Sequence, residues 1–246
     1  MRMILIHKAD EKSEAGIPPT LELIGTMGKL MEEIGRSGAL LAAEGLQPSS
    51  MAVRLAFSEG KPTLTCGPFP GGNGFIAGFA IVRLESMEQA IQWASRLAET
   101  VDEVDIGLVK EPWDLGLCPK PEGQMTRFMM MYKLDKAHEG NPGFGSERIR
   151  KWTQDMLKAG VLVLAESLQP SSKSARLQFK EGKISVADGP YTESKEIVGG
   201  FCMLQVGSRE EAIEWGSRFV KVLRDGKVEG NLELDICPLS EISSLL

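Results

Sequence analysis

The sequence predicts an α+β protein in which one folding unit occurs twice. Aligning the chain of 246 residues with itself at a shift of 122 positions matches its two halves, and the pentapeptide LQPSS at 46–50 recurs unchanged at 168–172. Each half also contains short apolar stretches typical of strands and two stretches with helical periodicity. The period is far longer than the roughly 20–50 residues of a solenoid repeat, so the sequence indicates two homologous copies.

Each copy is expected to open with a strand, at 3–6 and at 128–132. The apolar residues of these stretches do not alternate with polar ones, which predicts burial on both faces of the sheet. Loops rich in Gly, Pro and charged residues follow at 9–19 and 135–145, and we expect them to be exposed.

The first helix of each copy is expected at 21–36 and at 147–159, where apolar residues recur at helical spacing. Ser146 is the expected N-cap of the second of these helices. Gly38 and Gly160 follow the apolar pattern at the position where a glycine commonly ends a helix.

The second helix of each copy begins with a capping box at Ser86 and Ser208, each followed three residues later by Gln or Glu. The rest of each copy is expected to be β-structure, and Glu-Gly-Lys triplets mark the turn of a hairpin. The remaining expected strands lie at 39–43, 52–57, 62–65, 75–84 and 103–106, and at 161–165, 175–179, 184–187, 197–206 and 233–236.

Without its hairpin, each copy has the order βαββαβ, which is the ferredoxin-like split βαβ pattern. Such a sheet has helices on one face, and a second copy in the same chain can cover the other face. We therefore expect one repeat at 1–111 and a second repeat at 126–246. The linker between them, 112–125, contains prolines that interrupt helices and strands.

Composition narrows the classes of function. The net charge of −6 and the lack of Lys/Arg runs argue against a nucleic-acid partner. No apolar stretch approaches the ~20 residues that cross a bilayer, and no signal peptide is evident, so we expect no membrane partner and a cytoplasmic location. The four cysteines lack CxxC spacing, which predicts reduced, mostly buried thiols and no metal site: Cys66, Cys118, Cys202 and Cys237.

The stretch DGPYTESKE at 188–196 resembles the "DGPFAETKE" signature of the YCII-related proteins. The LQPSS pentapeptide and the opening of the second helix at 211–215 resemble the same family. The first repeat keeps Gly67, Pro68 and Phe69 of the signature, but it has a cysteine in place of the aspartate and lacks the charged residues that follow.

This resemblance implies a dimeric α+β barrel, in which two ferredoxin-like units pair their sheets around a cavity. A tandem chain would form that barrel internally, as a pseudo-dimer. Some relatives are thought to be enzymes that use a His–Asp pair, and relatives are often encoded beside extracytoplasmic-function sigma factors. The histidines of this chain, His7 and His138, do not lie in the first helix, where the resemblance would place a catalytic one. We expect neither to be a general base or a haem ligand, and we expect no cofactor.

The Asp188-Gly189-Pro190 segment has two interpretations. It is a structured turn, because Asp accepts backbone hydrogen bonds, Gly adopts unusual φ and Pro fixes φ. Alternatively, it lies at the mouth of the barrel and presents its charges to a ligand. Glu166 and Arg176 have a structural alternative as a strand-end ion pair, because both recur in the first repeat. The candidate ligand-binding residues are Asp188, Glu193, Lys195, Glu196, Glu166, Arg176 and Lys133.

Two classes of function remain open on the sequence. The first is a protein that binds a small polar metabolite, or a weak acid/base enzyme of lyase or isomerase type. The alternative is a non-catalytic interaction module connected with extracytoplasmic-function sigma factors, or an accessory domain pair without activity. The sequence leaves open whether any catalysis occurs and whether two chains form a further homodimer.

Overall fold

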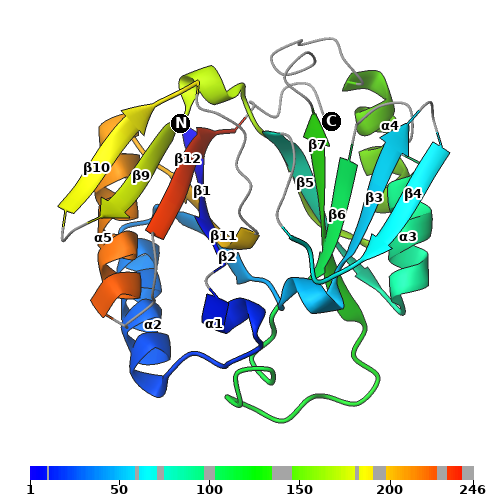
Figure 1. Cartoon of the computed structure of the whole chain (residues 1–246), viewed down its shortest axis with the longest axis horizontal. Helices are drawn as coiled ribbons and strands as arrows, with labels where there is room; N and C mark the ends of the chain where they lie inside the picture. Colours follow the sequence, from blue (N-terminus) through cyan, green and yellow to red (C-terminus); the bar gives the residue numbers. More distant parts are fainter. Residues whose placement is uncertain are drawn as a thin grey trace. The chain divides into compact units, whose positions relative to one another are not determined.

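The computed structural model describes residues 1–9, 11–58, 61–70, 75–96, 103–134, 146–180, 183–190, 198–225 and 232–239 (Figure 1). The helices are α1 (Glu11–Glu14), α2 (Leu21–Arg36), α3 (Met87–Ser95), α4 (Ser146–Lys158) and α5 (Arg209–Asp225), with 3-10 turns η1 (Ser49–Met51) and η2 (Ser171–Lys173). The strands are β1 (Arg2–Lys8), β2 (Leu40–Gly45), β3 (Val53–Ser58), β4 (Lys61–Cys66), β5 (Phe75–Leu84), β6 (Glu103–Leu108), β7 (Thr126–Leu134), β8 (Leu162–Ser167), β9 (Ala175–Lys180), β10 (Lys183–Asp188), β11 (Val198–Gln205) and β12 (Leu232–Pro238).

The chain forms two compact units, each built on one antiparallel sheet. In unit 1 the strand order is β10-β9-β12-β1-β11-β2, and α2 and α5 pack on one face. In unit 2 the order is β4-β3-β6-β7-β5-β8, and α3 and α4 pack on one face. The α+β class and the duplicated ferredoxin-like fold are therefore confirmed. The order β12-β1-β11-β2 places the last, first, third and second strands of the split βαβ pattern side by side, with the hairpin added beside β12.

Each sheet draws strands from both repeats, which the sequence did not predict. β1 and β2 come from the first repeat but pair with β11 and β12 of the second. In unit 2, β7 and β8 of the second repeat pair with β5 and β6 of the first. The sequence repeats and the compact units therefore divide the chain differently.

The repeated pentapeptide LQPSS marks where the chain passes from one unit to the other. The division falls between Leu46 and Gln47, and again between Leu168 and Gln169. The backbone N–H of Gln47 donates to Leu108 of β6, and that of Gln169 donates to Pro238 of β12, which anchors the new segment to its sheet. The linker at 112–125 stays within unit 2, because β6 and β7, which flank it, are neighbours in one sheet.

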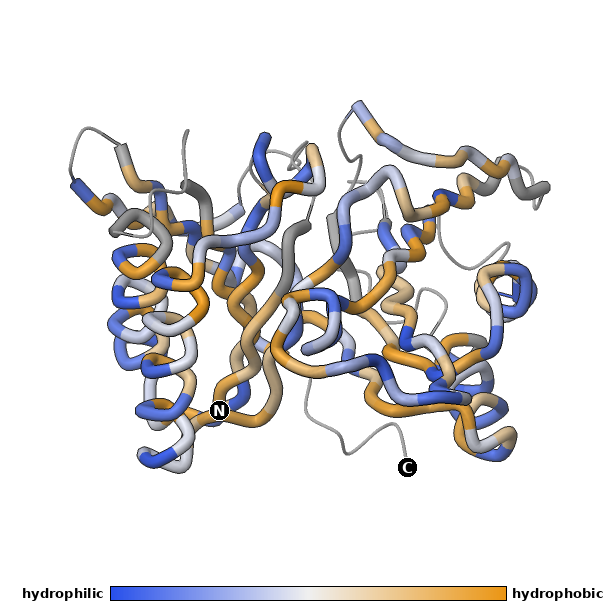
Figure 2. Tube along the Cα trace, turned by 90° about the horizontal axis from the view of Figure 1, so that it is seen from below, coloured by the Kyte–Doolittle hydropathy of each residue, from blue (hydrophilic) through white to orange (hydrophobic). Residues whose placement is uncertain are grey.

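Each sheet has its apolar core on the face that the helices cover. In unit 1, side chains of β1, β9, β11 and β12 contact α2 and α5, and Figure 2 shows hydrophobic positions running along the strands. In unit 2, Trp152 and Met156 of α4 and Ala90 and Ala94 of α3 pack against β-strand residues such as Val104. The helices therefore pack on the sheets through apolar residues at helical spacing.

Local signals placed most elements correctly. The first helix spans residues 21–36 as predicted, and the Ser86 and Ser208 hydroxyls accept N–H bonds from the residues three positions ahead. Gly38 and Gly160 have φ values of 77° and 69°, the left-handed conformation expected at a helix end. The expectation of an uninterrupted loop at 9–19 was wrong, because α1 forms there. Within the described residues, no helix has the length and apolar character that crossing a membrane requires.

Candidate functional site

Unit 2 contains a buried network of four charged side chains, here called the Arg54 cluster: Arg54, Glu103, Asp105 and Lys133. Arg54 of β3 binds Asp105 of β6 through two hydrogen bonds, Nε to Oδ1 at 2.6 Å and a terminal nitrogen to Oδ2 at 2.9 Å. Lys133 Nζ of β7 donates to Asp105 Oδ2 at 2.6 Å and to Glu103 Oε1 at 2.8 Å. Two cations and two carboxylates thus neutralise one another inside the protein.

Unit 1 contains a matching network, here called the Lys8 cluster: Lys8, Arg176 and Asp235. Arg176 of β9 donates from Nε to Asp235 Oδ1 at 2.7 Å and from a terminal nitrogen to Oδ2 at 3.2 Å. Lys8 Nζ, at the end of β1, donates to Asp235 Oδ2 at 2.8 Å. The side chains of Lys8 and Asp235 are only 6% and 8% exposed.

The two clusters occupy equivalent positions, and each one is assembled from both repeats. Lys8 belongs to the first repeat but binds Asp235 of the second, whereas Lys133 of the second binds Asp105 of the first. Successive residues of a strand point to opposite faces of its sheet. Since Leu177 faces the helices in unit 1, its neighbour Arg176 faces away from them, and the same alternation holds for the Arg54 cluster. Both clusters therefore lie on the helix-free face of their sheet.

The two aspartates stay ionised because their cations outweigh the effect of burial. Burial raises the pKa of Asp105, but the Arg54 hydrogen bond and the Lys133 charge hold it below its ordinary value of 3.8. The pKa of Asp235 is likewise held low against burial, by the Lys8 charge and the Arg176 hydrogen bond. At neutral pH these carboxylates accept hydrogen bonds and do not supply protons.

The lowered pKa values predict a loss of stability in acid. A carboxylate with a depressed folded-state pKa stabilises the native state above its unfolded-state pKa, and this stabilisation is lost as the pH falls through the folded-state value. We therefore expect the free energy of unfolding, measured by urea titration, to fall as the pH drops below about 4. Asp105→Asn should have a shallower acid dependence than the wild type, and equal slopes would contradict this assignment.

The signature segment of the first repeat contacts the Arg54 cluster through an aromatic ring, and it contains a tightly packed glycine. The Phe69 ring lies 4.3 Å from the Arg54 guanidinium carbon, a cation–π contact. The Phe69 N–H donates to Ser49 Oγ at 3.2 Å, and the preceding Gly67 donates its N–H to Ala52 at 3.0 Å. A Cβ added to Gly67 would lie 1.7 Å from the Ser49 carbonyl oxygen, so only glycine fits there. The glycine is thus required by close packing and not by its φ, since neither Gly67 nor Gly189 has the positive φ that the turn interpretation invoked.

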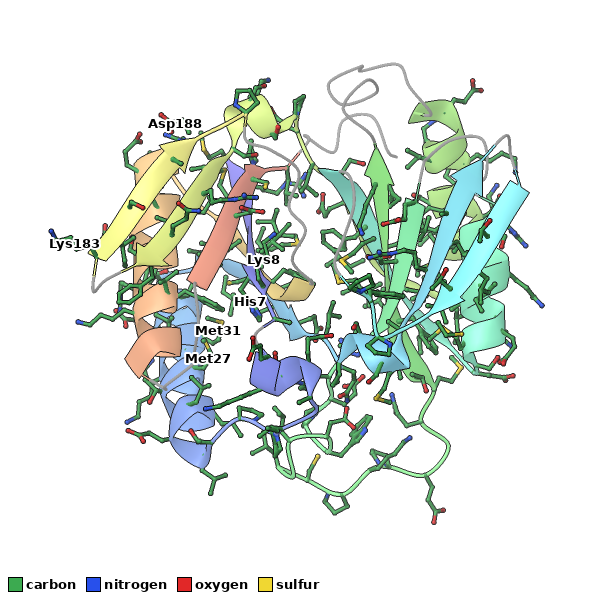
Figure 3. All side chains as sticks on the ribbon, in the orientation of Figure 1. His7, Lys8, Met27, Met31, Lys183 and Asp188 are labelled. Carbon is green, nitrogen blue, oxygen red and sulfur yellow. The ribbon has the colours of Figure 1, made fainter. Side chains whose placement is uncertain are left out.

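The charged residues unique to the second signature have a different status. Asp188 ends β10, and its side chain is 76% exposed and bound to Arg209 at the start of α5 (Figure 3). Glu193, Lys195 and Glu196 lie outside the described residues. A ligand-binding role for these four residues remains a prediction.

Of the other predicted residues, the structure brings Lys133 into the Arg54 cluster and Arg176 into the Lys8 cluster. Burial of Tyr132 raises the pKa of its hydroxyl to about 12, and the charge of Glu166, which is buried in β8, adds to this shift. Burial is the main cause of that shift, and it outweighs the 2.8 Å hydrogen bond between the Tyr132 and Ser167 hydroxyls. The Glu166–Arg176 ion pair remains a prediction, because the described partner of Arg176 is Asp235.

Sequence reasoning missed the acidic half of both clusters. Asp105 and Asp235 stand between apolar residues in the closing strand of each repeat, in the pattern Glu-x-Asp. Two carboxylates on one face of a buried strand require cations opposite, and this signal was present in the sequence. It did not identify the partners, because the arginines lie on distant strands of the same repeat and the lysines on strands of the other repeat.

Neither the histidine nor the cysteines form a reactive cluster in the described part of the chain. His7 packs against Phe219, with ring centroids 5.5 Å apart. Cys202 and Cys237 are buried, and burial raises the pKa of the Cys202 thiol to about 12. Cys66 and Cys118 are exposed, so the expectation of mostly buried thiols holds for only half of them. Among the described residues, no three His, Cys, Asp or Glu side chains group to hold a metal ion.

Comparison with known proteins identifies one family. The family model of the YCII-related domain matches the chain twice, over residues 1–109 and again over residues 126–226. No curated protein and no solved structure matches the chain.

Proposed function

The chain belongs to the YCII-related family, and we propose that it binds a small, polar, anionic metabolite through the Arg54 and Lys8 clusters. The observation that supports this proposal is that a buried lysine and a buried arginine meet at one aspartate in both units. A small-molecule site combines an apolar lining with a few fixed polar groups, and the helix-free faces have that composition.

Buried ion pairs are weak evidence for stability, because the desolvation of the charges offsets their attraction. Apolar residues of similar size would often stabilise the fold equally well. The retention of two equivalent charge networks therefore favours a function that needs charges at these positions. Arg and Lys are the side chains that recognise carboxylate and phosphate oxygens.

The lysines are the groups that we expect to contact the ligand. An ammonium group has three donors, and the described contacts use two at Lys133 and one at Lys8. A ligand carboxylate would accept the remaining donors, while the aspartates keep the cations oriented. Because Asp105 and Asp235 are held ionised, the two clusters suit binding better than proton transfer at neutral pH. We therefore place binding before acid/base catalysis.

A thermal-shift experiment tests the proposal. Lactate, succinate and citrate at millimolar concentration should raise the unfolding midpoint above that in chloride of equal ionic strength. A ligand at a hundredfold excess over its Kd stabilises by about 2.7 kcal/mol. The increase should be smaller in Lys8→Gln and in Lys133→Gln, and retained in Lys151→Gln, which alters an exposed ion pair of α4. The proposal would be contradicted if the wild type showed no increase over chloride. It would also be contradicted if Lys8→Gln and Lys133→Gln both showed the same increase as the wild type.

Three further expectations remain proposals beside this one. The family resemblance supports a barrel in which the two sheets enclose the ligand site. The same resemblance supports a link with extracytoplasmic-function sigma factors as an alternative role. A cytoplasmic location follows only from the sequence argument.

A further inference from the structure

Strand β10 is an exposed edge of the unit 1 sheet. It pairs with β9 and ends the strand order, and all six of its residues are exposed. The edge strands β2 and β8 differ, because most of their residues are at least partly buried. An edge strand that is open along its whole length presents unpaired backbone groups to a further strand.

The hairpin geometry shows which residues present those groups. Lys180 pairs with Lys183, so two residues connect β9 and β10, and the closing pair of such a hairpin is hydrogen-bonded. Hydrogen-bonded and non-hydrogen-bonded pairs alternate along an antiparallel ladder. Ile184, opposite Phe179, and Val186, opposite Leu177, therefore direct their backbone N–H and C=O groups away from β9.

The equivalent edge of unit 2 is blocked at one of these positions. Strand β4 has the same hairpin register, and Pro62 lies opposite Phe57 where β10 has Ile184. A proline has no N–H, so it removes an outward donor without costing β4 a bond to β3. Proline on an edge strand is a common protection against strand addition. The two repeats thus differ at the position that decides whether another strand can pair.

We propose that β10 pairs antiparallel with β10 of a second copy of this chain and so forms a homodimer. The two copies are related by a two-fold axis that is perpendicular to the sheet and passes through Ser185, so the same face of each sheet points to the same side. Ile184 of each copy then lies opposite Val186 of the other. Each of these two pairs exchanges both N–H···O=C bonds and brings apolar side chains together. Both side chains are exposed in the single chain, at 36% and 48%.

The charges at the ends of β10 favour this register over the next one. Lys183 and Asp188 stand at opposite ends of the strand (Figure 3). With Ser185 on the two-fold axis, Lys183 lies opposite Ala187 and not opposite its own copy. If the axis passed through Val186 instead, Ile184 would lie opposite Asp188, whose carboxylate already binds Arg209. The interface is small, so we expect weak association.

Sedimentation equilibrium over a concentration series reaching the millimolar range tests the proposal. The wild type should move from 26.8 kDa toward twice that mass. Ile184→Pro, which copies the residue of β4, should remain monomeric, since it removes an outward donor and no bond to β9. Ile184→Thr keeps the donor and the β-branched shape, so it should still associate. A wild type that stays monomeric throughout, or a dimer that Ile184→Pro leaves intact, overturns the proposal.

Disulfide cross-linking tests the register. Non-hydrogen-bonded antiparallel pairs bring their side chains close enough for a disulfide. In a background where the exposed Cys66 and Cys118 are replaced by serine, Ser185→Cys should oxidise to a covalent dimer. Lys183→Cys in the same background should not form a covalent dimer, because residue 183 of one chain lies opposite Ala187 of the other and far from the second residue 183. Equal cross-linking of the two variants would overturn the register.

Discussion

Replacing Gly189 by alanine is expected to destabilise the protein by at least about 3 kcal/mol. A Cβ at this position would lie 1.8 Å from the Ser171 carbonyl oxygen and 2.8 Å from its carbon. Both atoms belong to the backbone, so no side chain can rotate to make room. The Gly189 N–H also donates to Ser174 at 3.0 Å, which holds the two segments together. Urea unfolding monitored by circular dichroism would measure the loss.

Two further glycines provide the controls for this experiment. Gly67→Ala in the first repeat should have a comparable effect, because its Cβ would lie 1.7 Å from the Ser49 carbonyl oxygen. Gly28→Ala in α2 has nothing within 4 Å of the new Cβ, and we expect it to stabilise the protein by roughly 0.5–1 kcal/mol. If Gly189→Ala unfolded at the same urea concentration as the wild type, the close approach of the two segments would be refuted.

The substitution Asp105→Asn is expected to cost about 3–5 kcal/mol of unfolding free energy, because it leaves buried cations without their shared carboxylate. Arg54 loses a charged partner for two hydrogen bonds, and Lys133 keeps only Glu103. The asparagine amide also directs N–H donors at groups that are themselves donors. Guanidinium chloride unfolding at neutral pH would measure the difference.

Asp235→Asn provides the matched variant in the Lys8 cluster, and we expect a loss of the same order. Asp155→Asn alters an exposed pair with Lys151 on α4 and should have a much smaller effect. The structural assignment of the clusters fails if Asp105→Asn is no more destabilising than Asp155→Asn.

Local signals in the sequence were sufficient for most of the secondary structure. The capping serines Ser86 and Ser208 and the helix-ending glycines Gly38 and Gly160 act on their immediate neighbours, so their effect can be read without knowing the fold. The sequence singled out the glycine of the Gly-Pro pair for its freedom of φ, but neither Gly67 nor Gly189 has a positive φ. Each glycine is required because the backbone of Ser49 or Ser171 approaches it closely. The short helix α1 was missed because its four residues carry too little pattern.

The composition of the two charge clusters could be only half predicted. Arg176 and Lys133 were singled out, but their partners Asp235 and Asp105 were not, and Asp188 was one of the carboxylates proposed in their place. The side chain of Asp188 is exposed on an edge strand, where a charge needs no buried partner. The buried aspartates lie 59 and 28 residues along the chain from those cations, and no local signal spans such a separation.

The sequence by itself determined the duplication and the order of the main helices and strands, because each depends on neighbouring residues or on comparing the two halves. Only the tertiary structure decided which repeat supplies each strand of a sheet. The opening strands of both repeats are apolar and equally suited to either sheet, so local pattern cannot choose between them. The choice is made by pairing across the whole chain, and it places Lys8 beside Asp235 and Lys133 beside Asp105.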